Sequence, residues 1–217
     1  MPSRPVMRDV TSSAPRVGRA TARDVRGRVR RALAFGCLAA ALFVSGVGSG
    51  ESSTLPVSVQ VELLSKVVRY DRSMAARAQA SLVVLIVVKA NDVESARSAA
   101  QLQAALAKTP SFGGFQHEEA VVNFAGASQL VETSRQRKAS IVLLTPGFED
   151  ELEPIRLALE GVNVLSVGSV ARYVTKGTVL GFDVVAGRPK ILVNLRQAKR
   201  QNVNFDSELL KISTVIQ

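Results

Sequence analysis

The side chains that could carry out chemistry are few in this sequence. His117 is the only histidine and Cys37 the only cysteine, which excludes an intrachain disulfide and a zinc site of the usual Cys/His kind. His117 lies in a turn-rich segment next to a glutamine and two glutamates. This setting predicts an exposed loop histidine, not the base of a nucleophilic enzyme. A hydrolytic enzyme is therefore the weakest of the functional classes considered.

Two further groups of residues have ordinary structural explanations. The acidic cluster at 149–153 precedes an apolar run, where carboxylates favour the amino end of a helix, and it lacks the ligand spacing of a calcium loop. Gly113 and Gly114 lack the further glycine and the lysine of a phosphate-binding loop, so they are interpreted as turn residues. The sequence predicts no catalytic residue, no metal and no cofactor.

Positive charge is the strongest polar signal. The formal net charge is +10, but residues 1–50 hold nine arginines and two aspartates, which leaves the rest of the chain close to balanced. Seven basic residues and one acidic residue fall between positions 172 and 200. We expect Arg172, Arg188 and Lys190 to contribute to a face for an acidic partner or an anionic small ligand, the alternative being ordinary solvated surface. The absence of interleaved aromatic residues argues against nucleic acid.

Two other places are candidates for binding. Asn194 interrupts the apolar run KILVNL, where it either bonds backbone groups at the end of a strand or points into a ligand crevice. If the basic residues are only solvated surface, the partner-binding site is expected on the first helix, around Leu63, Val67 and Tyr70.

The amino-terminal segment predicts export. A basic run that ends at Arg31 is followed by an apolar stretch at about 33–44 and then by small residues, which is the order of a secretory signal peptide. Cleavage between Val47 and Gly50 would remove Cys37. An uncleaved membrane anchor and a lipoprotein anchor on the cysteine are the alternatives. The arginine-rich leader also fits an overlong gene model, so no function is assigned to it.

After a connector at 51–55, residues 56–217 predict a single α/β domain. Apolar residues at helical spacing predict a first helix that begins near Pro56. Four short apolar runs then alternate with helical patterns, which predicts a mostly parallel sheet with helices on both faces. The strands are expected at 81–90, 118–125, 140–147 and 162–168, and the helices at 91–108, 126–137 and 148–161. The helix at 91–108 is expected to begin with a capping box of Asn91 and Glu94 and to bury a stripe that starts at Val93.

The carboxy-terminal part predicts a hairpin and a closing helix. Two strands, at 178–185 and 189–195, are separated by the turn residues Gly187, Arg188 and Pro189. The final helix is expected to be capped by Asp206 or Ser207 and to bury Leu209, Ile212 and Ile216.

The segment 177–217 resembles the carboxy-terminal signature of the YfiR family (YfiR/HmsC-like periplasmic proteins). That signature is a glycine-led strand, a turn, a strand ending in Asn-Leu, a short basic helix and a final Leu-Leu helix, in this order. The resemblance implies a single periplasmic domain. It also implies a regulator, because characterised members hold a membrane-bound diguanylate cyclase inactive and so keep cyclic di-GMP and biofilm output low.

This sequence departs from the better-known members in two respects. They have paired periplasmic cysteines, which this chain lacks, and an aromatic-rich segment on the first helix, where this chain has residues 67–72. The sequence therefore favours two alternative functions. One is a periplasmic regulator that binds the outward domain of a membrane signalling protein, and the other is a small-ligand binding protein with a crevice at the carboxyl ends of the parallel strands. A homodimer is a further alternative for the assembly.

Overall fold

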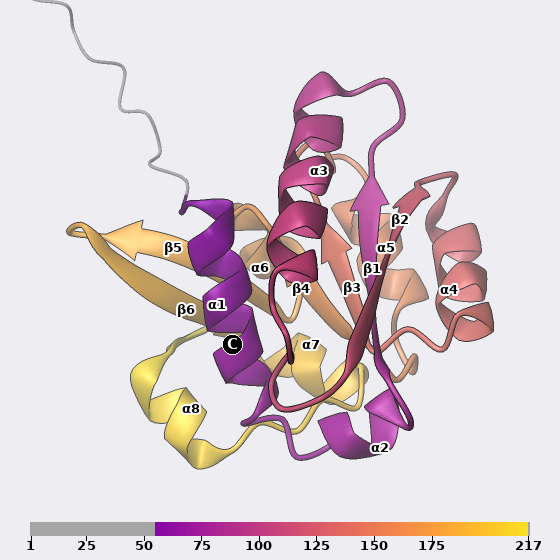
Figure 1. The fold of residues 1–217 in the computed structure, drawn as a ribbon. Helices are drawn as coiled ribbons and strands as arrows, with labels where there is room; N and C mark the ends of the chain where they lie inside the picture. The colour runs from indigo at the N-terminus through magenta and orange to yellow at the C-terminus, as the bar shows by residue number, and fades with distance from the viewer. Residues whose placement is uncertain (1–54, 217) are drawn as a thin grey trace, which may run out of the picture. The chain divides into compact units, whose positions relative to one another are not determined.

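Helices cover both faces of a seven-stranded sheet (Figure 1) in residues 55–216, which the computed structural model describes. The strand order is β2-β1-β3-β4-β5-β6-β7, and only the β5–β6 pair is antiparallel. The strands are β1 (Leu82–Val88), β2 (His117–Asn123), β3 (Ile141–Leu144), β4 (Leu165–Gly168), β5 (Leu180–Val185), β6 (Arg188–Asn194) and β7 (Thr214–Ile216). The helices are α1 (Val57–Val68), α2 (Met74–Ala78), α3 (Val93–Ala107), α4 (Ala127–Gln136), α5 (Leu152–Ala158), α6 (Arg172–Lys176), α7 (Leu195–Arg200) and α8 (Ser207–Ile212).

The predicted α/β class is confirmed, and strand β1 shows why the pattern was informative. Successive side chains of a strand point to opposite faces of the sheet. In β1, Val84 and Ile86 belong to one buried cluster, while Leu85 and Val87 belong to the other. A strand that needs apolar side chains at every position can only be a central strand that is covered on both sides.

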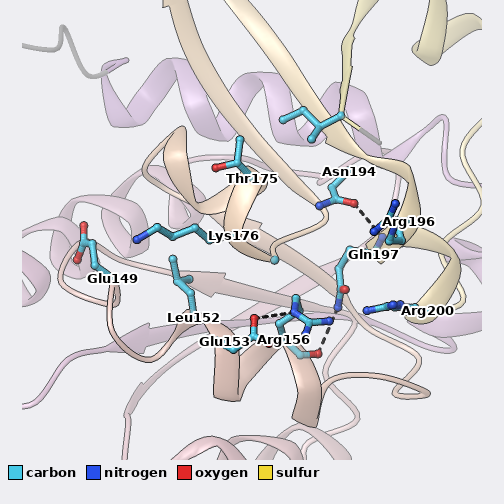
Figure 2. Close-up of a pocket in the computed structure, with 12 residues that line it drawn as sticks. Glu149, Leu152, Glu153, Arg156, Thr175, Lys176, Asn194, Arg196, Gln197 and Arg200 are labelled. Carbon is cyan, nitrogen blue, oxygen red and sulfur yellow. Dashed lines mark hydrogen bonds and ion pairs between the residues drawn. The ribbon is translucent and has the colours of Figure 1, made fainter.

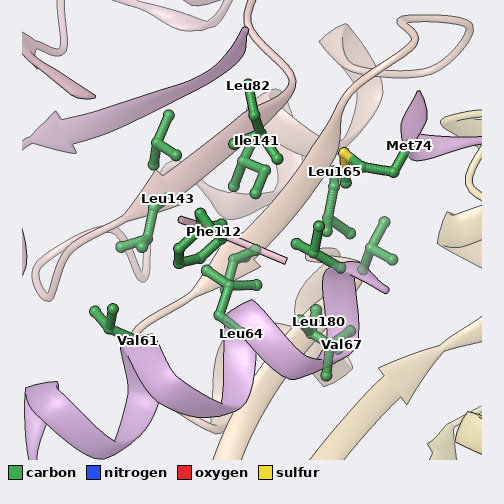
Figure 3. Packing of buried hydrophobic residues seen from close by; sticks show 14 of the residues in the cluster. Val61, Leu64, Val67, Met74, Leu82, Phe112, Ile141, Leu143, Leu165 and Leu180 are labelled. Carbon is green, nitrogen blue, oxygen red and sulfur yellow. The ribbon is translucent and has the colours of Figure 1, made fainter. Parts of the chain in front are cut away.

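The larger core cluster lies between the sheet and helix α1 (Figure 3). Val61, Leu64 and Val67 of α1 point toward strand residues of the sheet, and the Phe112 ring packs among them. Leu102 of α3 and Leu209 of α8 join this cluster. The cluster on the opposite face is built on α4, α5 and α6.

Helix α3 begins one residue later than predicted. Asp92, not Asn91, is the N-cap, and its Oδ1 accepts the backbone N–H of Ser95 at 2.8 Å. The capping box of Asn91 and Glu94 is therefore wrong. Val93 is 76% exposed, so the buried stripe does not start there. The buried face of α3 consists of Ser95, Ala99, Leu102 and Leu106, and at 100° per residue Val93 lies on the opposite side of the helix.

The hairpin is confirmed, but its turn is shorter than predicted. Arg188 pairs with Val185 and Pro189 with Val184, so both are strand residues. The two linking residues are Ala186 and Gly187, with φ of 50° and 73°. Positive φ at both positions is typical of the two-residue hairpin turn whose twist matches that of the flanking strands.

The closing segment forms a helix and a strand instead of one helix. Asp206 caps α8 as predicted, and Leu209 is buried. The helix stops at Ile212, which is 61% exposed, and β7 follows and pairs in parallel with β6. The prediction that Ile212 and Ile216 point inward from one helix is therefore wrong. The run Thr214, Val215, Ile216 is β-branched, and it completes the edge of the sheet.

Helix α6 was not anticipated from the pattern. It has only five residues, yet Tyr173 and Val174 are fully buried. It lies close to the sheet because glycines face it: a Cβ on Gly181 would come within 2.4 Å of Val174 Cγ2. Any larger residue at this position would push the helix away. The short helix α2 was not anticipated either.

His117 is the first residue of β2 rather than part of an exposed loop. Only 7% of its side chain is exposed, its Nε2 lies 3.2 Å from the Leu106 carbonyl oxygen, and its ring packs near Phe112. The expectation of an exposed loop histidine is therefore wrong. It serves as a packing residue between α3 and the edge strand.

A buried ion pair lies in the segment that follows α1. The Arg77 Nη1 atom lies 2.6 Å from Asp71 Oδ2, and 2% and 0% of the two side chains are exposed. Asp71 Oδ1 accepts from the Ser73 backbone and hydroxyl, and the Arg77 guanidinium donates to Asn163 Oδ1 and to the Asn202 carbonyl. This arrangement, here called the Asp71–Arg77 clasp, links the segment after α1 to the entrance of β4 and to the loop before α8.

The expected signal peptide and most of the connector lie outside the described residues. Within residues 55–216, no helix is long and apolar enough to cross a membrane. The same residues contain no group of three His, Cys, Asp or Glu side chains arranged to hold a metal ion.

Candidate functional site

The basic residues predicted to form one face lie on different elements. Arg172 begins α6, and its guanidinium is ion-paired with Glu149. Arg188 and Lys190 lie on the exposed part of β6, opposite Val185 and Asp183 of the hairpin. Asn194 lies at the other end of the same strand, where it contributes to a groove. Of the four residues, only Asn194 lines that groove.

The patch expected on the first helix is largely part of the core. Val67 is fully buried beneath α1. Leu63 and Tyr70 are partly buried and pack against the same cluster. The helix therefore presents no continuous apolar surface built from these three residues.

A groove of about 570 Å³ lies between α5, the end of α6 and the beginning of α7 (Figure 2). Polar and charged side chains make up most of its wall, and Leu152 and Ile216 add apolar surface. The lining residues are Glu149, Leu152, Glu153, Arg156, Thr175, Lys176, Gly177, Asn194, Arg196, Gln197, Arg200 and Ile216. Four of these side chains are cationic and two are anionic.

Asn194 is fixed in this groove by backbone groups. Its Oδ1 accepts the Gln197 N–H at 2.9 Å and so caps α7, and its Nδ2 donates to the Val174 carbonyl at 2.9 Å. Of the two roles left open by the sequence, backbone bonding is thus the one that is observed. The amide joins α6 to α7 and holds both walls of the groove in place.

An ion-pair network joins α5 to α7 along one side. The Arg156 guanidinium contacts Glu153 at 2.6 Å and Glu160 at 2.8 Å, and Arg200 contacts Glu160 at 2.7 Å. Each carboxylate at the groove is therefore paired: Glu149 with Arg172, and Glu153 with Arg156. Within residues 55–216, no ion pair or hydrogen bond of the Lys176 ammonium or the Arg196 guanidinium is found. Both groups are exposed at the groove, and no other group in this part of the chain occupies them.

The pKa shifts agree with this division of charge. Burial is the largest single effect on Glu149 and would raise its pKa, but the hydrogen bond from Arg172, a backbone hydrogen bond and the charge of Arg172 together outweigh it and lower the pKa of the carboxyl. A hydrogen bond from Arg156 lowers the pKa of Glu153. Both carboxylates therefore stay ionised at neutral pH and neutralise the arginines beside them, while the charges of Lys176 and Arg196 remain uncompensated.

A second concave surface, of about 430 Å³, lies at the carboxyl ends of β3 and β4. Residues from the beginnings of α1 and α3 and from the loops after the two strands line it, among them Gln60, Arg97, Pro146 and Ser169. The buried Ser169 hydroxyl oxygen has no hydrogen-bond partner among the described residues. This is the place where the sequence predicted a ligand crevice.

The adjoining point between β1 and β3, where the strand order reverses, is filled by the protein itself. Parallel sheets commonly bind ligands at such a point. Here the Ser95 hydroxyl contacts the Thr145 hydroxyl at 2.6 Å, and Thr145 donates to the Val87 carbonyl. Lys89 and Glu151 form an ion pair in front of them. A ligand in this region would bind in the neighbouring crevice and not between β1 and β3.

The pKa of Tyr173 tests whether α6 is packed against the rest of the protein as the structure shows. Its hydroxyl oxygen accepts the Phe148 N–H at 2.9 Å, and burial raises the pKa of the phenol to about 12. Since the folded pKa is raised, the contribution to stability is complete below the unfolded value of about 10 and is lost as the pH rises toward about 12, a change of about 2–3 kcal/mol.

Only two tyrosines are present, so the Tyr70→Phe variant leaves Tyr173 as the single phenol. Ultraviolet titration of this variant should give phenolate formation near pH 12 or release at unfolding. A midpoint near 10 in protein whose circular dichroism is still native would contradict the burial of the hydroxyl.

Several groove residues were not identified from the sequence. Arg156 lies on α5, in a segment interpreted only as a helix with an acidic start, and Gln197 and Ile216 gave no signal. The charge density between 172 and 200 did include Lys176, Arg196 and Arg200. Their convergence depends on the packing of α5, α6 and α7, which spacing along the chain does not encode.

Comparison with solved structures shows the fold alone. A Streptococcus pneumoniae ABC domain in complex with L-Trp is 12% identical, with a TM-score of 0.52, and the match covers 74% of this chain and 62% of that one. A conserved domain protein from Vibrio cholerae is 14% identical, with a TM-score of 0.52, and the match covers 75% of this chain and 60% of that one. The chain thus spans about three fifths of the length of these structures. No curated protein sequence matches closely enough to count as a relative.

A family model gives a firmer result. The YfiR/HmsC-like model (DUF4154) matches residues 58–214, from the beginning of α1 to the first residue of β7. This range includes both walls of the groove and the crevice at the carboxyl ends of the strands, and it covers well over half of the chain. The chain therefore belongs to the YfiR/HmsC-like family.

Proposed function

We propose that this protein is a non-enzymatic periplasmic regulator that holds a membrane-bound signalling protein inactive by binding its outward domain, and that the target is a diguanylate cyclase. The family match over residues 58–214 carries the proposal, because membership supports a regulatory role in the periplasm. Export by a cleaved leader, with the mature chain beginning near Glu51, is part of the proposal. The residue inventory agrees with a binding role, since the paired carboxylates and the packed histidine are used structurally.

The groove supports binding to a protein surface. It is open and polar, and it carries two cations without an ion-pair partner in the described part of the chain, features that suit recognition of an acidic surface better than the enclosure of an apolar ligand. Charge complementarity of this kind speeds encounter and weakens with salt.

Removal of the gene is expected to raise cellular cyclic di-GMP severalfold, and a plasmid copy of the full chain should restore the low level. Affinity capture of the tagged protein from cross-linked cells should recover a membrane cyclase. Unchanged cyclic di-GMP in the deletion strain, measured under conditions where the protein is produced, would contradict the choice of target.

The crevice near Ser169 favours a second candidate, a small-ligand binding protein. One of the similar folds was solved with L-Trp, so a free amino acid is a reasonable first probe. Saturable calorimetric binding that is lost in Ser169→Val, without any protein partner in the capture, would favour this function over the first.

A further inference from the structure

The basic groove brings together two cations that make no ion pair or hydrogen bond with the other residues that the structure describes. Lys176 lies at the end of α6 and Arg196 in the first turn of α7, on either side of Asn194 in the view of Figure 2. Both side chains are exposed and line the same groove. Within residues 55–216, every carboxylate at the groove is already paired with another arginine, so neither cation balances a charge of the described residues.

The surroundings of these two cations are rigid. Gln197, of which 2% is exposed, donates from Nε2 to the Arg156 carbonyl, and Gly161 N–H donates to the Arg200 carbonyl. The ion pairs of Arg156 and Arg200 add to these links between α5 and α7. The backbone of α7, which carries Arg196, is therefore held in place, and binding costs mainly the freedom of the two exposed side chains themselves.

The chemistry of the groove defines its occupant. Two cations that line one groove can bind two carboxylates, and the partly exposed Ile216 offers apolar surface for an aliphatic side chain. We propose that the groove binds an acidic segment of the partner protein in which carboxylates flank an aliphatic residue, with Lys176 and Arg196 as the contact residues. The identity of the partner rests on the proposed function, but the chemistry of the segment does not.

The experiment uses the protein purified from the periplasm and a short fluorescent peptide in which glutamates flank leucines. Fluorescence anisotropy should show binding that weakens with salt and that is lost when the glutamates are replaced by glutamines. The double variant Lys176→Glu, Arg196→Glu should bind about tenfold or more weakly. The matched control is Arg188→Glu, Lys190→Glu, which makes the same change of net charge on the hairpin, outside the groove. It should bind within about twofold of the wild type.

Absence of binding by the wild-type protein, or equal losses in the two double variants, would overturn the proposal, because the effect would then follow net charge and not the groove. Native circular dichroism of both variants excludes misfolding.

The same variants separate this inference from the proposed function. If peptide binding is lost in the groove variant but deletion of the gene leaves cyclic di-GMP unchanged, the groove is a site for acidic segments and the cyclase target is wrong. If deletion raises cyclic di-GMP and the groove variant restores repression fully, the groove proposal fails while the regulatory function stands.

Discussion

Replacement of Asp71 by alanine is expected to lower the free energy of unfolding by about 3–5 kcal/mol, because it leaves the Arg77 guanidinium buried without its carboxylate. Both side chains are almost completely shielded from water, and the 2.6 Å contact is supported by hydrogen bonds from Ser73 and to Asn163. Denaturant unfolding followed by circular dichroism measures the loss.

The neighbouring ion pair provides the control. Arg72 contacts Asp206 at 2.8 Å, but 62% of the arginine side chain is exposed. Arg72→Ala should therefore unfold close to the wild-type midpoint. A loss in Asp71→Ala no larger than in Arg72→Ala would mean that water reaches the clasp. Replacing both members, as in Asp71→Leu with Arg77→Leu, should recover part of the loss, since no unpaired charge then remains buried.

Gly113→Ala is expected to cost about 2–5 kcal/mol, the sum of backbone strain and overpacking. The residue has φ of 64°, and an added Cβ would lie 2.4 Å from Val68 Cγ1 and 3.2 Å from the Ser65 carbonyl oxygen. The loop is also tied to α1, because Gly113 N–H donates to the Ser65 hydroxyl at 2.9 Å. The methyl group would thus force the loop away from the first helix.

Gly114 is the matched control in the same turn. It has φ of 95°, but a Cβ there would meet no atom within 4 Å. Gly114→Ala should show the strain alone, about 1–2 kcal/mol. Equal melting temperatures for the two variants would show that the loop moves freely enough to absorb the contact with Val68.

The elements predicted best are those whose residue pattern is compatible with only one type of secondary structure. The apolar run of β1 fits only a doubly covered strand, and the spacing of Val61, Leu64 and Val68 fits only a helix with one buried face. The predictions failed where two local solutions compete. DSELLKISTVI has a helical stripe, but its last residues are β-branched and a free strand edge on β6 was available, so tertiary pairing decided the outcome.

The site was harder to predict than the fold. Density of charge between 172 and 200 indicated a basic region, yet it did not separate Arg172, which is neutralised by Glu149, from Lys176, which is not. That difference depends on a carboxylate more than twenty residues earlier in the chain. The role of Val67 was equally hard to predict, because an apolar helix residue can belong to the core or to a contact surface, and only the packing decides between the two.

The number of paired residues differs between neighbouring strands of the sheet, and this difference determines how a segment bound in the groove would affect the stability of the sheet. Strands β1 and β2 pair over seven positions, whereas β4 and β5 pair only at Val167 with Leu180 and at Gly168 with Gly181. The groove spans this narrow seam, with α5 contributed from before it and α6, β6 and α7 from after it. A bound segment would contact residues on both sides of the shortest strand pairing in the described sheet. If the segment binds only while β4 and β5 are paired, its binding raises the free energy of local opening between these strands. Binding of a partner would then also protect this part of the sheet from local unfolding.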